Sequence, residues 1–155
     1  MDRWNLDALY TGCDSEAFKK DFDAVDLHIR TLNDLSEHLD QNDPVTTCRN
    51  IVTSLSDYVT LTGRLGNYLS LRNSANTSDT EIVSLFSRLN MKDSHSAVAI
   101  TRFKKWIAQQ DIDALCAADP LLKEHEFWLN EIIPKFLLNR RLTYFAACGE
   151  IPEAS

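Results

Sequence analysis

The sequence predicts an all-α protein, an antiparallel bundle of three long helices followed by one or two short C-terminal helices. Three observations support this fold class. Only four glycines and four prolines occur among 155 residues, so few turns interrupt the chain. Apolar residues recur at steps of three and four, the spacing of an amphipathic helix, and capping residues precede these segments. We expect an arm at residues 1–13, a helical domain at 14–133 and a divergent tail at 134–155.

The first long helix is expected to begin after Asp14 or Ser15, since either side chain can cap it. Its apolar stripe comprises Phe18, Phe22, Val25, Ile29, Leu32, Ser36 and Leu39. The preceding arm is interpreted as extended. Its Trp4 and Tyr10 are expected to dock on the helices, because burial of an aromatic side chain removes about 150–250 Å² from water.

The second helix is expected over residues 44–74, with Pro44 at its first position behind an aspartate cap. Its apolar residues are Val45, Cys48, Ile51, Val52, Leu55, Tyr58, Val59, Leu65, Tyr68, Leu69 and Leu71. Gly63 and Gly66 lie inside it, and each costs roughly 0.8–1 kcal/mol relative to alanine. We therefore predict a close helix–helix contact at these glycines, or a kink near residue 64.

A third helix is expected from Thr77 or Ser78, as its cap, to Gln109. Its buried side is predicted to carry Ile82, Leu85, Phe86, Leu89, Ala97, Ile100, Phe103 and Ile107. One or two helical turns follow at residues 111–116. A last helix is expected to start at Asp119-Pro120 and to extend to Ile133, before Pro134.

Charge and cysteine content restrict the class of protein. The chain carries 16 basic and 23 acidic residues, a net charge of −7, and nucleic-acid binders need a concentrated basic face. The basic doublets, at Lys19, Lys104 and Arg140, lie in segments of mixed charge and are interpreted as solvated helix faces. No membrane span or signal peptide is apparent, so nucleic acid and membrane are not expected partners and a cytoplasmic location is expected. Four scattered cysteines, Cys13, Cys48, Cys116 and Cys148, are expected to be reduced and structural.

The segment beginning His125-Glu126 resembles half of a zinc-peptidase motif. Such enzymes use His-Glu-x-x-His because residues four apart on a helix can bind one metal ion while the glutamate activates water. Here Leu129 occupies the second ligand position. His28 and His38 are ten residues apart on one helix, about 15 Å, and cannot share an ion.

Two further groups of polar residues are interpreted as structural. Asp93, Ser94 and His95 are adjacent on one predicted helix, whereas a nucleophilic triad draws its members from separate elements. Carboxylates such as Asp21, Asp23 and Asp26, and the pair Glu124 and Glu126, are expected to be solvated. We therefore predict no catalytic, cofactor-binding or metal-binding residue in this chain.

Three segments together resemble the start of the oligoendopeptidase F family. The first is Trp4–Tyr10 followed by Asp14–Phe18, the second is Tyr68–Asp79, and the third is Leu115–Leu129. The resemblance covers about residues 3–132. Members of this family are cytosolic zinc metallopeptidases that cleave short peptides inside a deep channel. Their zinc site lies several hundred residues beyond the N-terminal helices, so no zinc ligand or catalytic residue is carried over to this chain.

The resemblance implies a non-catalytic N-terminal helical domain whose partner is an absent catalytic domain. Zinc and peptide substrates belong only to the full-length enzymes. An alternative is a stand-alone helical module for protein interaction or dimerisation. The apolar residues Trp128, Ile132 and Ile133, followed by Phe136, Leu137 and Leu138, lead us to predict a homodimer through this region.

Overall fold

A computed structural model describes residues 6–132, and all regular structure in that range is helical. The helices are α1 (Glu16–Glu37), α2 (Pro44–Ala75), α3 (Thr80–Ser94), α4 (Ala97–Ile107), α5 (Ile112–Ala118) and α6 (Pro120–Glu124). Residues 126–132 are also helical. The predicted fold class is confirmed, because α1, α2 and the rod formed by α3 and α4 pack together and short helices follow them.

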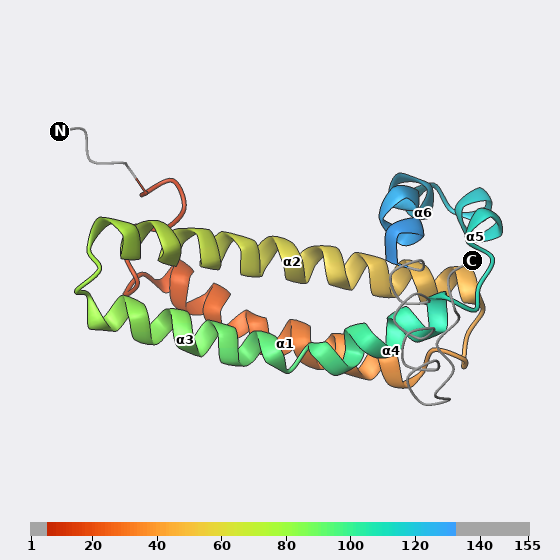
Figure 1. Ribbon diagram of the computed structural model, residues 1–155, viewed down its shortest axis with the longest axis horizontal. Helices are drawn as coiled ribbons and strands as arrows, with labels where there is room; N and C mark the ends of the chain where they lie inside the picture. Colours follow the sequence, from red (N-terminus) through yellow and green to blue (C-terminus); the bar gives the residue numbers. More distant parts are fainter. Residues whose placement is uncertain (1–5, 133–155) are drawn as a thin grey trace, which may run out of the picture.

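The three long elements lie side by side (Figure 1). The chain runs along the bundle in α1, returns in α2, and runs forward again through α3 and α4, so α2 is antiparallel to both neighbours. Helices α5 and α6 lie beside the first turns of α2. None of the helices described is long and apolar enough to cross a membrane.

Helix α1 follows the predicted pattern. The Ser15 hydroxyl accepts a hydrogen bond from the Phe18 backbone N–H at 3.3 Å, so Ser15 is the cap. Every member of the predicted stripe is buried: Phe18, Phe22, Val25, Ile29, Leu32, Ser36 and Leu39. The stripe packs chiefly against α2, which confirms that helical periodicity identified the core-facing side of this segment.

Helix α2 begins at the predicted residue, but its glycines do not contact another helix as predicted. Asp43 caps it by accepting from the Thr46 N–H at 3.0 Å, and Pro44 is its first residue. A Cβ atom built on Gly63 or Gly66 would meet no neighbouring atom within 4 Å. The predicted close helix contact at these glycines is therefore wrong, since both lie on a side of α2 that no other described element covers. Val59 and Leu71, two of the apolar residues named for this helix, are exposed.

For the third helix, the structure differs from the prediction in the capping residue and in which side chains are buried. Its cap is Asp79, not Thr77 or Ser78, because the Asp79 carboxylate accepts from the backbone N–H groups of Glu81 and Ile82. Phe86 and Ala97, expected on the buried side, are exposed, whereas Trp106 is buried and was not expected there.

The rod is also interrupted at His95 and Ser96, beside a cross-helix contact. The Tyr58 hydroxyl of α2 donates to the Asp93 carboxylate and lies 3.4 Å from Ser96 Oγ. Ser96 in turn donates to the Asp93 carbonyl through both its N–H and its hydroxyl. These bonds span three residues rather than four, which ends α3 before α4 begins.

The arm docks through Tyr10. This side chain is 3% exposed, and its ring meets Phe18 and Tyr68 edge-on, with centroids 5.3 Å and 5.2 Å away. The predicted docking of Tyr10 is confirmed, and Trp4 lies outside the described residues. The interpretation of the arm as an extended segment is wrong for residues 6–10. These residues form a turn, in which the N–H of Tyr10 donates to the Leu6 carbonyl.

The C-terminal helices form a second core at the far end of the bundle. Helix α6 starts behind Asp119 as predicted, but a turn at His125 separates it from the helical residues 126–132. Leu122 and Leu129 are fully buried there, with Cys48 of α2 and Ile107 of α4 in the same cluster. Ile133, Phe136, Leu137 and Leu138 lie outside the described residues.

Candidate functional site

In the zinc half-motif, a core residue occupies the position of the second ligand. Leu129, at the second ligand position, is fully buried in the second core. Glu126 forms an ion pair with Lys123, its Oε2 lying 2.7 Å from Nζ. Among residues 6–132 no group of three or more histidine, cysteine, aspartate and glutamate side chains is arranged to hold a metal ion.

The structure keeps the other histidines apart. His28 lies within α1, and His38 ends that helix, where its ring Nδ1 lies 2.7 Å from the Asp34 carbonyl oxygen. The His95 carbonyl accepts from the Asn33 side-chain amide at 3.4 Å. His28 and His38 thus lie ten residues apart, within α1 and at its C-terminal end.

Hydrogen bonds within the helical bundle, rather than a catalytic arrangement, involve the adjacent residues Asp93 and Ser94. Asp93 accepts from the Tyr58 hydroxyl, and the Ser94 hydroxyl donates to the Met91 carbonyl at 2.6 Å. The arrangement leaves the serine hydroxyl bonded to its own helix rather than to a general base.

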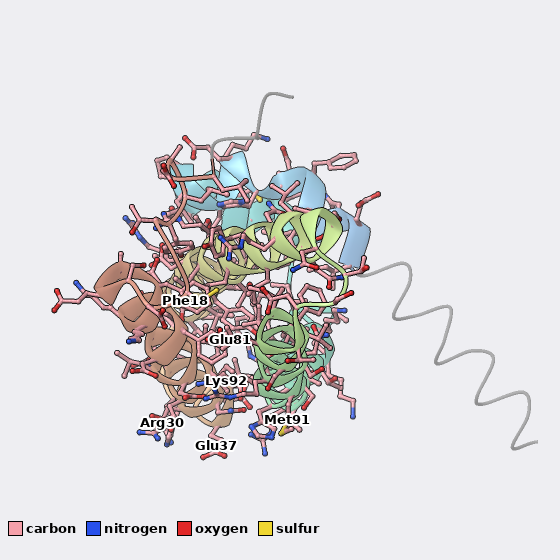
Figure 2. All side chains as sticks on the ribbon, turned by 90° about the vertical axis from the view of Figure 1, so that its left-hand side faces the viewer. Phe18, Arg30, Glu37, Glu81, Met91 and Lys92 are labelled. Carbon is pink, nitrogen blue, oxygen red and sulfur yellow. The ribbon has the colours of Figure 1, made fainter. Side chains whose placement is uncertain are left out.

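Two carboxylates of α1, which were predicted to be solvated, form ion pairs with other helices; the Asp21 side chain is 22% exposed and that of Asp26 is 47% exposed. Asp21 Oδ2 accepts from the Tyr10 hydroxyl at 2.6 Å and lies 3.3 Å from Arg64 Nη1. Asp26 forms an ion pair with Lys92 of α3. Figure 2 shows Lys92 between α1 and α3, and its ammonium lies 4.9 Å from the centroid of the Phe22 ring. The charges of Asp21 and Asp26 therefore join α1 to neighbouring helices. The spacing of residues along the sequence does not reveal this role.

Tyr58 makes a polar contact from within the core, since it is only 3% exposed. Burial, and then the hydrogen bond to Asp93, raise the pKa of Tyr58 to about 12. The phenol therefore stays neutral near pH 7 and acts as a hydrogen-bond donor that joins α2 to the end of α3. The sequence offered no signal for this pairing, because the partners are 35 residues apart.

The described cysteines are free thiols. Cys48 is fully buried, and burial raises the pKa of its thiol to about 12, so little reactive thiolate forms near neutral pH. Burial also raises the pKa of Cys116, whose thiol lies 3.4 Å from the Leu122 carbonyl oxygen. Both positions agree with a structural role, and Cys148 lies outside the described residues.

Two neighbouring aromatic residues form the most exposed apolar feature beside the second core. Phe127 is 78% exposed and Trp128 is 36% exposed. One side of the Trp128 indole stacks on Phe103 of α4, with ring centroids 6.4 Å apart. This surface is suited to binding rather than to chemistry, since it offers apolar area and no nucleophile.

No protein-family model, no curated protein and no solved structure matches the chain.

Proposed function

We propose that this chain is a non-catalytic helical domain of an enzyme resembling the oligoendopeptidase F zinc metallopeptidases. In such an enzyme it packs against a catalytic domain and contributes to the wall of the channel that admits short peptides. Zinc and the peptide-cleaving residues belong to the catalytic domain.

The observation that carries the proposal is the position of the three resembling segments in the fold. Tyr10 and Phe18 belong to the first segment and Tyr68 to the second, and their rings contact one another in the main core. In the third segment Asp119 caps α6 and Leu129 is fully buried. Residues that carry the resemblance are thus residues that hold the helices together.

A second feature supports packing against another domain. Val59, Gly63 and Gly66 are three to four residues apart and therefore share one side of α2. Val59 is 59% exposed, and the space beside both glycines is open. A helix of a neighbouring domain can approach such a surface closely, because no side chain projects from the glycines.

The test is to express the reading frame that continues beyond codon 155 and to measure its zinc content and its cleavage of a fluorogenic oligopeptide. We expect a downstream His-Glu-x-x-His helix, one zinc ion per chain, and loss of cleavage when the glutamate of that motif is replaced by glutamine. A reading frame that encodes no such helix contradicts the proposal and favours the stand-alone interaction module.

A pair of variants in α2 tests whether the glycine surface packs against another domain. Gly63→Leu is expected to leave residues 1–155 folded, but to reduce the activity or thermal stability of the longer protein. Asp57→Leu changes an exposed residue on another side of the same helix and is expected to leave the longer protein unchanged. Equal effects of the two variants would contradict a contact at the glycines.

A further inference from the structure

The surface formed by Phe127 and Trp128 is bordered by acidic residues. Glu131 follows Phe127 by four residues and Trp128 by three, so on the helical residues 126–132 it lies beside both rings. Glu124 precedes Trp128 by four residues, across the turn at His125. We call Glu124, Phe127, Trp128 and Glu131 the acidic aromatic patch.

The two carboxylates of this patch form no ion pair with another of the described residues. Glu124 and Glu131 are both exposed. Glu126 differs, since Lys123 neutralises it. A matching occupant therefore combines apolar side chains, to cover the rings, with basic side chains, to pair with the two carboxylates.

We propose that the occupant is the segment formed by residues 135–141 of the same chain. It contains Phe136, Leu137 and Leu138 for the rings, and Lys135, Arg140 and Arg141 for the carboxylates. Residues 133–149 carry these three basic residues and no acidic one, in a chain whose net charge is −7. An arginine can also stack on an exposed indole face.

The segment can reach the patch. Ile132 lies one helical turn from Trp128, about 6 Å along the axis. The four residues from Ile132 to Phe136 span up to about 14 Å when extended. Tethering also gives the segment a local concentration in the millimolar range.

A second copy of the chain is a poorer occupant. A two-fold contact places the same surface of each copy against the other. Such a contact through the patch brings Glu124 and Glu131 of one copy towards the same residues of the second, and opposed like charges disfavour association.

The experiment measures acrylamide quenching of Trp128 in the full chain carrying Trp4→Phe. Trp106 remains but is only 7% exposed, so quenching reports mainly on Trp128. The triple variant Phe136→Ser, Leu137→Ser, Leu138→Ser is expected to raise the quenching rate and shift the emission to longer wavelength. An unchanged quenching rate in this variant would overturn the proposal, provided that circular dichroism shows it to be folded.

Charge exchange separates a specific contact from a general loss of apolar surface. Arg140→Glu with Arg141→Glu is expected to expose Trp128, and adding Glu124→Lys with Glu131→Lys is expected to restore its protection. The matched control is Lys19→Glu with Lys20→Glu, in the first turns of α1, at the end of the bundle away from α6. We expect this variant to leave the quenching of Trp128 unchanged. Failure of the exchange to restore protection, or protection of Trp128 that is lost on dilution, would overturn the proposal, the latter because it indicates a second copy.

Discussion

Arg49 of α2 and Asp119, which lie 70 residues apart in the sequence, form an ion pair in which Nη1 is 2.8 Å from Oδ2. The other carboxylate oxygen, Oδ1, accepts from the backbone N–H groups of Leu121 and Leu122. One aspartate therefore both caps α6 and joins it to the first turns of α2. This double role accounts for its burial, since its side chain is only 6% exposed.

Replacement of Asp119 distinguishes its two roles. Asp119→Ala removes the cap and is expected to destabilise the protein by about 1 kcal/mol more than Asp119→Asn, because asparagine also caps helices well. In a chain of this size that difference corresponds to about 2–4 °C in melting temperature. Thermal unfolding followed by circular dichroism measures it, and equal melting temperatures would show that the cap is unimportant.

The glycines of α2 offer a stabilising change. Gly63→Ala and Gly66→Ala are each expected to raise the free energy of unfolding by up to roughly 0.8–1 kcal/mol, because alanine favours the helix and its Cβ meets open space. Ser70→Ala, also on an exposed position of α2, is a control with a smaller expected gain. Destabilisation by either glycine variant in urea unfolding would mean that another part of the protein occupies this space.

The arm is expected to contribute to stability chiefly through Tyr10, while Leu6 and Cys13 pack against the same core. Tyr10→Ala should cost about 3–5 kcal/mol, as other large-to-small changes of buried aromatics do. Tyr10→Phe keeps the ring but loses the hydrogen bond to Asp21, at a cost of about 1 kcal/mol. Leu9→Ala, at a neighbouring exposed position, is the control. Urea unfolding compares the three variants, and a Tyr10→Ala variant as stable as Leu9→Ala would mean that the arm is not docked.

Tyr58 makes stability depend on pH at the alkaline end. Its pKa rises from an ordinary 10 to about 12 in the folded chain, so the folded state holds its proton more tightly than the unfolded state. Its contribution is therefore complete below pH 10 and is lost as the pH rises from about 10 to 12. Urea unfolding at pH 9 and pH 11 should show a smaller loss of stability in Tyr58→Phe than in the unsubstituted chain. An identical loss in both would contradict this role.

Local signals predicted most of the helices. Ser15, Asp43 and Asp119 cap helices as expected, and the stripe of α1 is entirely buried, because capping and periodicity are properties of neighbouring residues. The break between α3 and α4 was not predicted. Apolar spacing continues through His95 and Ser96, whereas the break consists of backbone and side-chain bonds from Ser96 to Asp93, beside Tyr58 of another helix.

Side-chain exposure and ion pairing were predicted less well, because both depend on contacts between helices that are distant in the sequence. Phe86 fits the helical spacing of α3 but is 36% exposed, because spacing along one helix does not show how far the neighbouring helices extend around it. The ion pairs of Asp21 with Arg64 and of Asp26 with Lys92 also depend on which helices become neighbours. The absence of the second zinc ligand, in contrast, was apparent from Leu129 alone.

Zinc analysis of residues 1–155 after dialysis, combined with an oligopeptide cleavage assay, tests most directly whether this chain is a non-catalytic domain. We expect zinc well below one ion per chain and no cleavage, because Leu129 is buried where the second ligand of the motif would stand. One tightly bound zinc ion per chain that is lost in His125→Ala, or cleavage that depends on Glu126, would contradict it.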